Sequence, residues 1–384
     1  MSLRPNTAAG FQPLLTDNLS AEILYGYGDP CVARDAGGWW LAVTSNDAPQ
    51  SFPILRSEDL RSWRLAGFMF PQGAKPAWAM DGPGSDFWAP EIHRADEGWI
   101  GCFAARTKTG QLAVGLARAQ TPAGPWTAEP EPLLAGGVID PHLVVEPGGR
   151  TLLFWKEDAN DLWPGLLAAL LHEAPQLVGE VFPDPAQAQV ARAAAEAWPQ
   201  TERLGPMARF EALRGLIDAA TDEFAACHAR LERLEGPRAA AIREAMRTRI
   251  FAQALEGGRL AGERTLVLQN DQPWEAHLIE GMWVTNAAGR WWMFYSGNDF
   301  ATARYGIGVA QADDPLGPWT KAAAPFLTST AEWRGPGHPS VAEGPDGRPW
   351  LFLHAFRPGE MGYKVFRALL GLPLAFLDDG VRPA

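Results

Sequence analysis

The sequence has few of the residues that mark several common protein classes. Its 384 residues include only three cysteines, Cys31, Cys102 and Cys227, which are far apart and odd in number, so a disulfide framework is not expected. Cys31 and Cys102 lie within apolar runs and are predicted to be core residues. Lys and Arg total 33 against 45 Asp and Glu, giving a net charge of −12. This balance argues against nucleic acid or an anionic membrane as a partner.

Long apolar runs are also missing. No uninterrupted run is long enough to span a bilayer, and the opening MSLRPNTAAGFQPLL has no long apolar segment after its charge. We therefore expect a soluble cytoplasmic protein, with the reservation that a chain that had lost a signal peptide would look the same. Tryptophan, in contrast, is abundant, with 17 residues. Most of them are expected to pack in the interior, because large aromatic side chains dominate cores.

One short pattern occurs five times along the chain. An acidic or small residue, usually followed by proline, opens an apolar run, and a glycine-containing turn leads into a second apolar run. Such runs predict β-hairpins, and their repetition predicts a solenoid or a propeller. A second repeat, Gly124-Pro125-Trp126 and Gly317-Pro318-Trp319, closes two of the units. The sequence therefore predicts an all-β, five-bladed β-propeller.

The middle of the chain interrupts the third unit with a different composition. It is rich in Ala, Leu, Arg and Glu, and its apolar residues recur at helical spacing. These residues are Phe210, Leu213, Leu216 and Ile217, and then Ile242, Met246, Ile250 and Phe251. We predict an α-helical insertion in the third blade. The predicted parts are a lead-in (1–24), the propeller up to the third blade (25–161), the insertion (162–262) and the rest of the propeller (263–384).

Three of the five openings carry an acid, at Asp29, Asp140 and Glu280. The first strand of each propeller blade lies nearest the axis, so these acids should converge at one end of it. Two carboxylates across a pocket can hydrolyse a glycosidic bond, and a third can keep the proton donor's pKa high. A lone Asp-Pro more often ends a strand, but three acids at equivalent positions favour a site. Trp88 and Trp283 are candidates to stack on a sugar.

The opening motifs resemble those of glycoside hydrolase family 43. The similar segments are Gly28-Asp29-Pro30, Trp88-Ala89-Pro90-Glu91, Ile139-Asp140-Pro141, Trp155-Lys156-Glu157-Asp158, Glu280-Gly281 and Gly337-His338. They follow the family's order over roughly 25–160 and 264–375, and the SEDLRSW and GPW tails are also similar. That family contains five-bladed propeller enzymes that act mostly on arabinose- and xylose-containing glycans.

The resemblance implies roles for individual residues. Asp29 would be the general base, Glu280 the general acid, and Asp140 the acid that tunes the donor's pKa and orients it. The family inverts, which implies a Glu280–Asp29 carboxyl separation of ~6.5–9.5 Å. His338 corresponds to a histidine beside a central calcium or sodium ion; the alternative is a hydrogen-bonded turn residue, because calcium prefers oxygen ligands. Arg357 resembles an arginine that contacts sugar hydroxyls, and the alternative is a solvated loop residue.

The resemblance requires no cofactor for the reaction, so an ion near the axis would be structural. Two features depart from the family. The helical insertion could cover the pocket rim, pair two copies of the chain in a homo-oligomer, or decorate the edge, since amphipathic helices must bury an apolar face. The missing secretion signal favours processing of imported oligosaccharides. His142, next but one after Asp140, is predicted to be structural.

Three functions stay open at this point. The first is an inverting, exo-acting α-L-arabinofuranosidase or β-xylosidase whose partner is an oligosaccharide. The second is a retaining, fructose-releasing hydrolase with Asp29 as nucleophile and carboxylates about 5–5.5 Å apart. The third is a catalytically inactive, sugar-binding propeller whose helical insertion docks a partner. The presence of all three acids favours the first over the third, because an inactive site does not need them.

Overall fold

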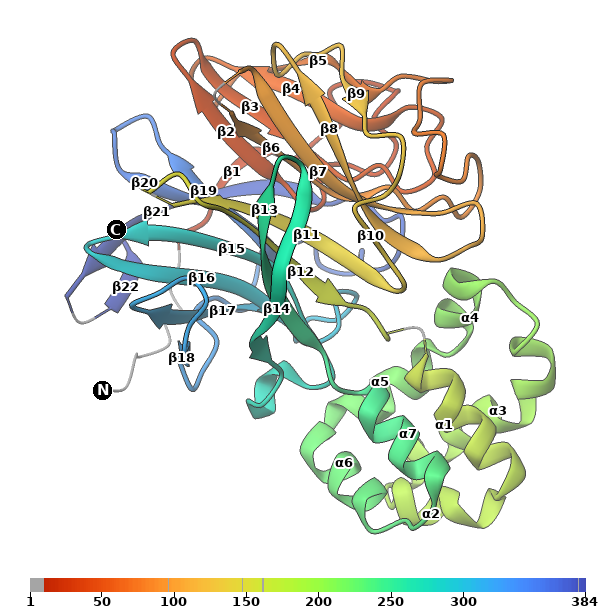
Figure 1. The fold of residues 1–384 in the computed structure, drawn as a ribbon. Coiled ribbons are helices and arrows are strands. Elements are labelled where there is room, and N and C mark those ends of the chain that lie inside the picture. The colour runs from red at the N-terminus through yellow and green to blue at the C-terminus, as the bar shows by residue number, and fades with distance from the viewer. Residues whose placement is uncertain (1–9, 96, 147, 161, 379) are drawn as a thin grey trace. The chain divides into compact units, whose positions relative to one another are not determined.

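The computed structural model describes residues 10–384 except 96, 147, 161 and 379. The chain forms two compact units. The β unit runs to Glu157 and continues with Arg249–Leu268 and Glu280–Ala384, and the helical unit comprises Asp158–Thr248 and Gln269–Ile279. The β unit is all-β and consists of several antiparallel sheets (Figure 1).

The sheets of the β unit follow one another along the chain. The first sheet has the order β2-β3-β4-β5, with β2 Cys31–Asp35, β3 Gly38–Ala42, β4 Ser51–Ser57 and β5 Trp63–Phe70. The second has the order β10-β8-β7-β6, with β6 Trp88–Arg94, β7 Trp99–Arg106, β8 Leu112–Ala119, β9 Thr127–Ala128, which pairs with β8, and β10 Leu134–Ala135. The third has the order β11-β12-β13-β14, with β11 Val138–Val145, β12 Thr151–Glu157, β13 Arg249–Glu256 and β14 Arg259–Gln269.

The last two sheets contain both the end and the beginning of the chain. The fourth has the order β15-β16-β17-β18, with β15 Ile279–Ala287, β16 Arg290–Gly297, β17 Gly306–Ala312 and β18 Thr320–Lys321. The fifth has the order β1-β21-β20-β19, with β1 Gln12–Leu15, β19 Arg334–Glu343, β20 Pro349–Phe356, β21 Ala368–Leu377 and β22 Gly380–Pro383, which pairs with β21. Each predicted opening thus stands at the first strand of a separate sheet. The fifth sheet begins with β19 in this sense, because β1 is added to it from the start of the chain.

The prediction of an irregular lead-in over 1–24 is wrong for Gln12–Leu15. These residues form β1, which pairs with β21 at the far end of the chain. The run is only four residues long and contains a proline, so it carries no local strand signal. Its strand conformation depends on a partner more than 350 positions away in the sequence, as the pairing of Gln12 with Gly371 shows.

The chain between β12 and β13 is helical. Its helices are α1 Trp163–Glu173, η1 Pro175–Leu177, α2 Val178–Val181, α3 Pro185–Thr201, α4 Pro206–Ala212, α5 Arg214–Asp222, α6 Phe224–Glu232 and α7 Pro237–Ala245, and η2 Pro273–Glu275 belongs to the same unit. Asp184 caps α3 by accepting hydrogen bonds from Ala186 and Gln187. Among the helices that the structure describes, none is long and apolar enough to cross a membrane.

The predicted end of the helical segment at residue 262 is wrong. The last helix ends at Ala245, and β13 starts at Arg249 and pairs with β12, so that Ile250 lies opposite Lys156. Ile250 and Phe251 fit a helical stripe only because a short apolar run fits either periodicity. The pairing with β12 decides the matter in favour of a strand, because tertiary context overrides local propensity.

Hydrogen bonds join the sheets of the β unit in a cycle. Each joins a backbone N–H in, or just before, one sheet's first strand to a side chain of the preceding sheet. The fifth sheet is taken to precede the first. The bonds are Asp29 N to His354 Nδ1 (3.0 Å), Ala89 N to Thr44 Oγ1 (2.8 Å), Leu143 N to Glu91 Oε2 (3.3 Å), Gly281 N to Asp140 Oδ2 (2.8 Å) and His338 N to Ser296 Oγ (2.7 Å). All five pairs of neighbouring sheets are therefore linked through their first strands.

Most tryptophans are buried, as the sequence predicts, and Trp155, Trp163 and Trp292 are among the largest fully buried side chains. The two GPW tails also match in structure. The indole of Trp126 donates to the carbonyl of Pro122 at 3.0 Å, and that of Trp319 donates to Pro315 at 3.2 Å. The three cysteines are free and buried, which confirms the core prediction for Cys31 and Cys102.

Candidate active site

A single backbone feature sets the positions of the predicted acids. The residues Asp29, Ala89, Asp140, Gly281 and His338 occupy the same place in the five sheets, and all have a left-handed φ between 48° and 55°. Pairing with the next strand shifts register at this point in β6, β11 and β19, as in a β-bulge. A bulge redirects a side chain, and a left-handed φ is uncommon for residues other than glycine. Such strained positions cluster at functional sites.

Asp29 lies in a cluster of basic groups. Its Oδ1 is 2.7 Å from Nη1 of Arg367, 3.5 Å from Nδ1 of His338 and 3.3 Å from Nδ1 of His354, and Thr44 donates a hydrogen bond to its Oδ2. Burial alone would raise the pKa of Asp29, but Arg367, followed by His338 and His354, outweighs it and holds that pKa well below its ordinary value. Asp29 is therefore an ionised carboxylate at neutral pH, as a general base must be.

Asp140 is in the opposite electrostatic situation. Its side chain is buried, and its Oδ2 accepts the N–H of Gly281 at 2.8 Å. Burial raises the pKa of Asp140 to about 7; His338 and Lys156 oppose this rise, and the negative charges of Glu280 and Asp29 add to it. The structure thus brings Asp140 within electrostatic range of both other predicted acids. A carboxyl with its pKa raised in this way keeps its proton near neutral pH.

Glu280 is held by two donors. Nζ of Lys156 lies 2.9 Å from Oε2, and the hydroxyl of Tyr305 donates to Oε1 at 2.8 Å. Burial, with the neighbouring charge of Glu280, raises the pKa of Tyr305 well above its ordinary value, so this hydroxyl keeps its proton. The Lys156 side chain is fully buried, and its ammonium is paired with a carboxyl oxygen of Glu280. Both oxygens of Glu280 therefore have fixed directions.

The remaining predicted residues have mixed surroundings. Trp88 is half-buried, and its indole donates to Asn46 at 2.9 Å. Trp283 is only 9% exposed and packs against the rings of His142 and His93, so these contacts give no support to its predicted stacking on a sugar. Arg357 donates to the carbonyl of Thr16 and lies 3.2 Å from a carboxylate oxygen of Asp17. These contacts do not involve Asp29, Asp140 or Glu280.

Comparisons with known proteins show the family of this chain. The family model described as glycosyl hydrolases family 43 matches residues 23–209 and 242–381, which is most of the chain. The chain belongs to glycosyl hydrolase family 43. A curated relative, xylosidase/arabinosidase 43A of Humicola insolens, is 34% identical over 80 residues, which are 21% of this chain and 23% of the relative. The matched stretch is therefore under a quarter of that relative's length.

Solved structures from family 43 share the fold. A thermostable family-43 glycoside hydrolase is similar with a TM-score of 0.66 and 23% identity, covering 93% of this chain and 92% of that one. An α-L-arabinofuranosidase from Lactobacillus brevis is similar with a TM-score of 0.59 and 18% identity, covering 93% of each chain. At these identities the likeness concerns the fold alone.

Family 43 implies an ion beside His338, and the side chains around His338 fit a calcium or sodium site poorly. The carboxylate of Asp29 lies 3.5 Å from Nδ1 of His338, but it already binds Arg367 and Thr44. The carboxyl of Asp140 binds the N–H of Gly281. Hard cations prefer several oxygen ligands. Because both carboxylates are already bound, the described side chains around His338 would offer mainly one imidazole nitrogen. We derive no chemical step through such an ion.

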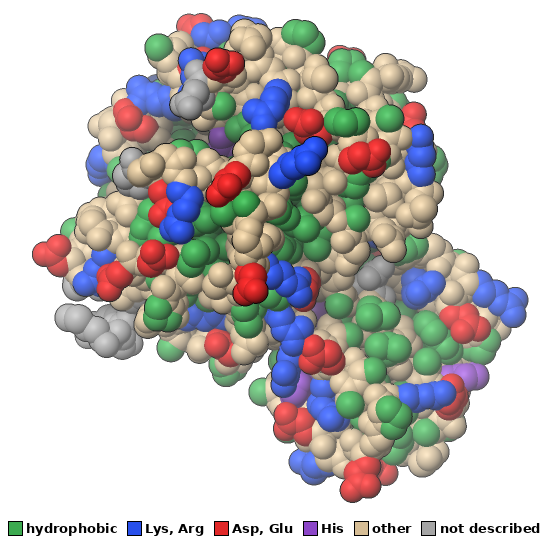
Figure 2. All heavy atoms as spheres, viewed as in Figure 1, with side chains coloured by type: hydrophobic (Ala, Val, Ile, Leu, Met, Phe, Trp, Pro, Cys, Tyr) green, Lys and Arg blue, Asp and Glu red, His purple; other side chains and the backbone are tan. Residues whose placement is uncertain are grey.

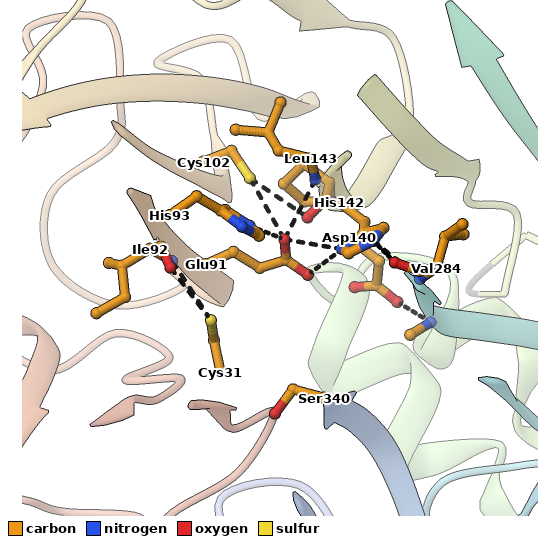
Figure 3. A network of polar contacts seen from close by, with 12 residues as sticks. Cys31, Glu91, Ile92, His93, Cys102, Asp140, His142, Leu143, Val284 and Ser340 are labelled. Atoms are coloured by element: carbon orange, nitrogen blue, oxygen red, sulfur yellow. Dashed lines mark hydrogen bonds and ion pairs between the residues drawn. The ribbon is translucent and has the colours of Figure 1, made fainter. Parts of the chain in front are cut away.

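A second set of possible ligands lies elsewhere in the β unit. Among the described residues, the ligand atoms of Glu91, His93 and Cys102 lie within 4.8 Å of one another. The Glu91 carboxylate already contacts His93 and His142, and Leu143 N–H donates to it (Figure 3). Its hydrogen-bonding capacity is thus used by protein groups, and we interpret the set as a hydrogen-bond network rather than a metal site.

Sequence reasoning missed several residues of the site. Arg367, rather than Arg357, is the fifth-sheet arginine that reaches Asp29. His354 and Tyr305 contact the acids from β20 and from the segment before β17. A histidine inside the apolar run WLFLHAF was a usable signal for His354, because a polar residue there needs a partner. Arg367 has no comparable signal, because it stands in a loop just before β21.

Replacing Arg367 by Met should lower kcat/KM at pH 7 by roughly 10- to 100-fold, because the base loses its fixed position and its charge partner. Arg367 lowers the pKa of Asp29, so its removal raises that pKa. The acidic limb of the kcat/KM–pH profile should then move to higher pH. The matched control is Arg357→Met, which removes an arginine bound to Thr16 and Asp17. An unmoved acidic limb in R367M would refute the role of Arg367.

Replacing Asp140 by Asn should stabilise the protein more at pH 8 than at pH 5. The folded-state pKa of Asp140 is raised to about 7, so wild type loses stability as pH rises from the unfolded-state value through 7. The gain in the variant should be roughly 2–3 kcal/mol larger at pH 8 than at pH 5. Asn tolerates the left-handed φ and still accepts the Gly281 N–H. Urea unfolding at both pH values checks this, and an equal gain at both would contradict it.

Proposed function

We propose that this chain is an inverting glycoside hydrolase that releases arabinose or xylose from the ends of oligosaccharides, as an α-L-arabinofuranosidase or a β-xylosidase. The observation that carries the proposal is the meeting of Asp29 and Asp140, whose pKa values are driven in opposite directions, with Glu280. Pairs of carboxyl groups with separated pKa values are the arrangement that acid–base hydrolysis of a glycoside needs. The names of the Humicola insolens and Lactobacillus brevis relatives support a pentose substrate.

We also propose that the five sheets are the blades of a β-propeller and that α1–α7 are an insertion in its third blade. The cycle of hydrogen bonds between successive sheets supports closure, because it also links the fifth sheet to the first. The placement of β1 beside β21 supports it further, since the N-terminal strand completes the sheet formed by the end of the chain. The two strands that flank the helices, β12 and β13, pair in one sheet.

In the proposed reaction Asp29 accepts a proton from water as the water oxygen attacks the anomeric carbon. The bond from that carbon to the leaving oxygen breaks, and Glu280 gives the leaving oxygen a proton. Near neutral pH Asp140 keeps its proton, because burial and the negative charges of Glu280 and Asp29 disfavour its ionisation. Lys156 and Tyr305 fix the two oxygens of Glu280 and stabilise its carboxylate after the proton has left.

The experiment that tests the proposal compares aryl α-L-arabinofuranoside, aryl β-D-xyloside and the fructose-containing sucrose as substrates for the full chain. Hydrolysis of a pentoside, without release of fructose, is the expected result. Release of fructose would instead establish the retaining fructose-releasing hydrolase. Binding of xylo- or arabino-oligosaccharides with no turnover of any substrate would establish a sugar-binding protein and overturn the proposal.

Pairing of two copies through the helical unit is a further part of the proposal. Val190 and Leu204 in that unit are 39% and 40% exposed, and hydrophobic side chains lie among charged ones on its surface (Figure 2). Exposed apolar side chains on amphipathic helices favour association, although single ones are common on monomers. Light scattering after size-exclusion chromatography distinguishes one copy of 41.7 kDa from two.

A further inference from the structure

A buried network lies two residues beyond the left-handed turns. Its members, here called the Glu91 network, are the side chains of Glu91, His93, Cys102 and His142 and the backbones of Leu143 and Val284 (Figure 3). Glu91 and His142 are 5% and 1% exposed. The network joins β6, β11 and β15. The residues with left-handed φ in these strands are Ala89, Asp140 and Gly281.

We propose that Glu91 and His142 are positioning residues for Glu280: Glu91 selects one tautomer of His142, and that tautomer holds β15 in the register that places Glu280 beside Asp140. The inference rests on the proposed function, in which Glu280 is the proton donor. Neither residue touches substrate in this account. Both act through the backbone of β15.

Two hydrogen bonds attach the start of β15 to β11. The Val284 N–H donates to Nε2 of His142 at 2.9 Å, and the Gly281 N–H donates to Asp140 at 2.8 Å. These two bonds fix the start of β15 at points three residues apart, and Glu280 directly precedes the first of them. A shift of β15 would therefore move Glu280 relative to Asp140.

The bond from Val284 also determines which imidazole nitrogen carries the proton. A ring nitrogen that accepts the Val284 N–H must carry a lone pair, so the proton of neutral His142 is on Nδ1. Nδ1 lies 3.0 Å from both carboxylate oxygens of Glu91, which accept this proton's hydrogen bond. The carbonyl oxygen of Val284 is 3.3 Å from Nε2. In the other tautomer Nε2 would donate to this carbonyl and could no longer accept the Val284 N–H.

Glu91 is itself held rigidly. Its Oε2 lies 2.6 Å from Nε2 of His93 and accepts the Leu143 N–H at 3.3 Å. Burial alone would raise the pKa of Glu91, but His142 and His93 lower it to about 2, so the carboxylate stays ionised. The ring of Trp283 packs on His142 with centroids 4.6 Å apart and restricts its rotation. The carboxylate thus presents a fixed acceptor to Nδ1.

Another link of the same kind provides a comparison inside the molecule. The Ile92 N–H lies 3.4 Å from Sγ of Cys31, which joins β2 to β6 at the equivalent depth. The sheet held by that link has Ala89, and no acid, at its left-handed turn. Loss of the Cys31 link should therefore disturb packing without displacing a proton donor.

The first test observes the tautomer directly in wild-type protein, without any activity. ¹⁵N-histidine labelling and NMR should show His142 as the Nδ1–H tautomer at pH 7, assigned by loss of its signals in His142→Gln. An Nε2–H tautomer would overturn the inference. This measurement stands whether or not the protein hydrolyses glycosides, so its failure is distinct from failure of the proposed function.

The second test measures dependence on the leaving group, using Glu91→Gln. An amide can donate to Nδ1 and favour the other tautomer, so Glu280 should be misplaced. We expect kcat on a poorly activated aryl pentoside to fall about 10- to 100-fold with little change in KM, and kcat on a dinitrophenyl pentoside to fall about twofold. Cys31→Ala should change both substrates alike. Equal losses on both substrates in E91Q would refute the inference.

Discussion

Replacing Asp29 by Asn should lower kcat by at least about 1,000-fold on every substrate, whatever its leaving group. In the proposed reaction Asp29 is the group that activates the water. Asn keeps the left-handed φ, since short polar side chains tolerate it, and its oxygen can still accept from Thr44. The loss should therefore come from chemistry. Steady-state kinetics on two aryl pentosides of different leaving-group acidity measures it.

The control for this prediction is Asp17→Asn, which changes an exposed carboxylate that contacts Arg357. It should retain wild-type kinetics. Asp29→Asn also removes the charge partner of the half-buried Arg367, so a lower melting temperature is expected. A folded D29N protein that retained more than a tenth of wild-type activity would remove Asp29 from the mechanism.

Replacing Glu280 by Gln should produce a different pattern of loss. A substrate with a poor leaving group needs its leaving oxygen protonated, so its kcat should fall by roughly 1,000-fold, within the usual range for general-acid catalysis. A dinitrophenyl leaving group needs little protonation, and its kcat should fall less than tenfold. Gln can still accept from Tyr305, which limits any displacement of the site.

Two outcomes would contradict the role of Glu280. Equal losses on both substrates would indicate a positional or structural effect, and a larger loss on the activated substrate would exclude proton donation. Lys156, buried and paired with Glu280 at 2.9 Å, would lose this contact with a carboxyl oxygen in E280Q. Circular dichroism and thermal unfolding at the assay temperature therefore accompany the kinetics, so that only folded protein is compared.

The acids of the candidate site were predictable because they belong to a repeat. Asp29 and Asp140 stand at the same left-handed turn in their sheets, and Gly281 occupies that turn after Glu280. The sequence displays this equivalence as an acid or small residue before an apolar run. Local pattern therefore contained both the start of each sheet and the position of the acids.

The partners of the acids were harder to predict, because they come from distant segments. Arg367 contacts Asp29 across 338 positions of sequence, and Lys156 contacts Glu280 across 124. Local sequence also gave no warning that Gln12–Leu15 pairs with β21 or that Arg249–Glu256 is a strand beside β12. In each case a partner that is remote in sequence decides the structure, and periodicity contains no information about it.

The configuration of the first-formed sugar distinguishes a general base at Asp29 from a nucleophile. It can be followed by ¹H NMR during hydrolysis of an aryl pentoside by wild-type protein. A base that activates water opposite the leaving group produces the inverted anomer. With Asp29 as general base, we expect the inverted anomer to appear first and then to equilibrate by mutarotation. First appearance of the retained anomer would make Asp29 a nucleophile and contradict the account.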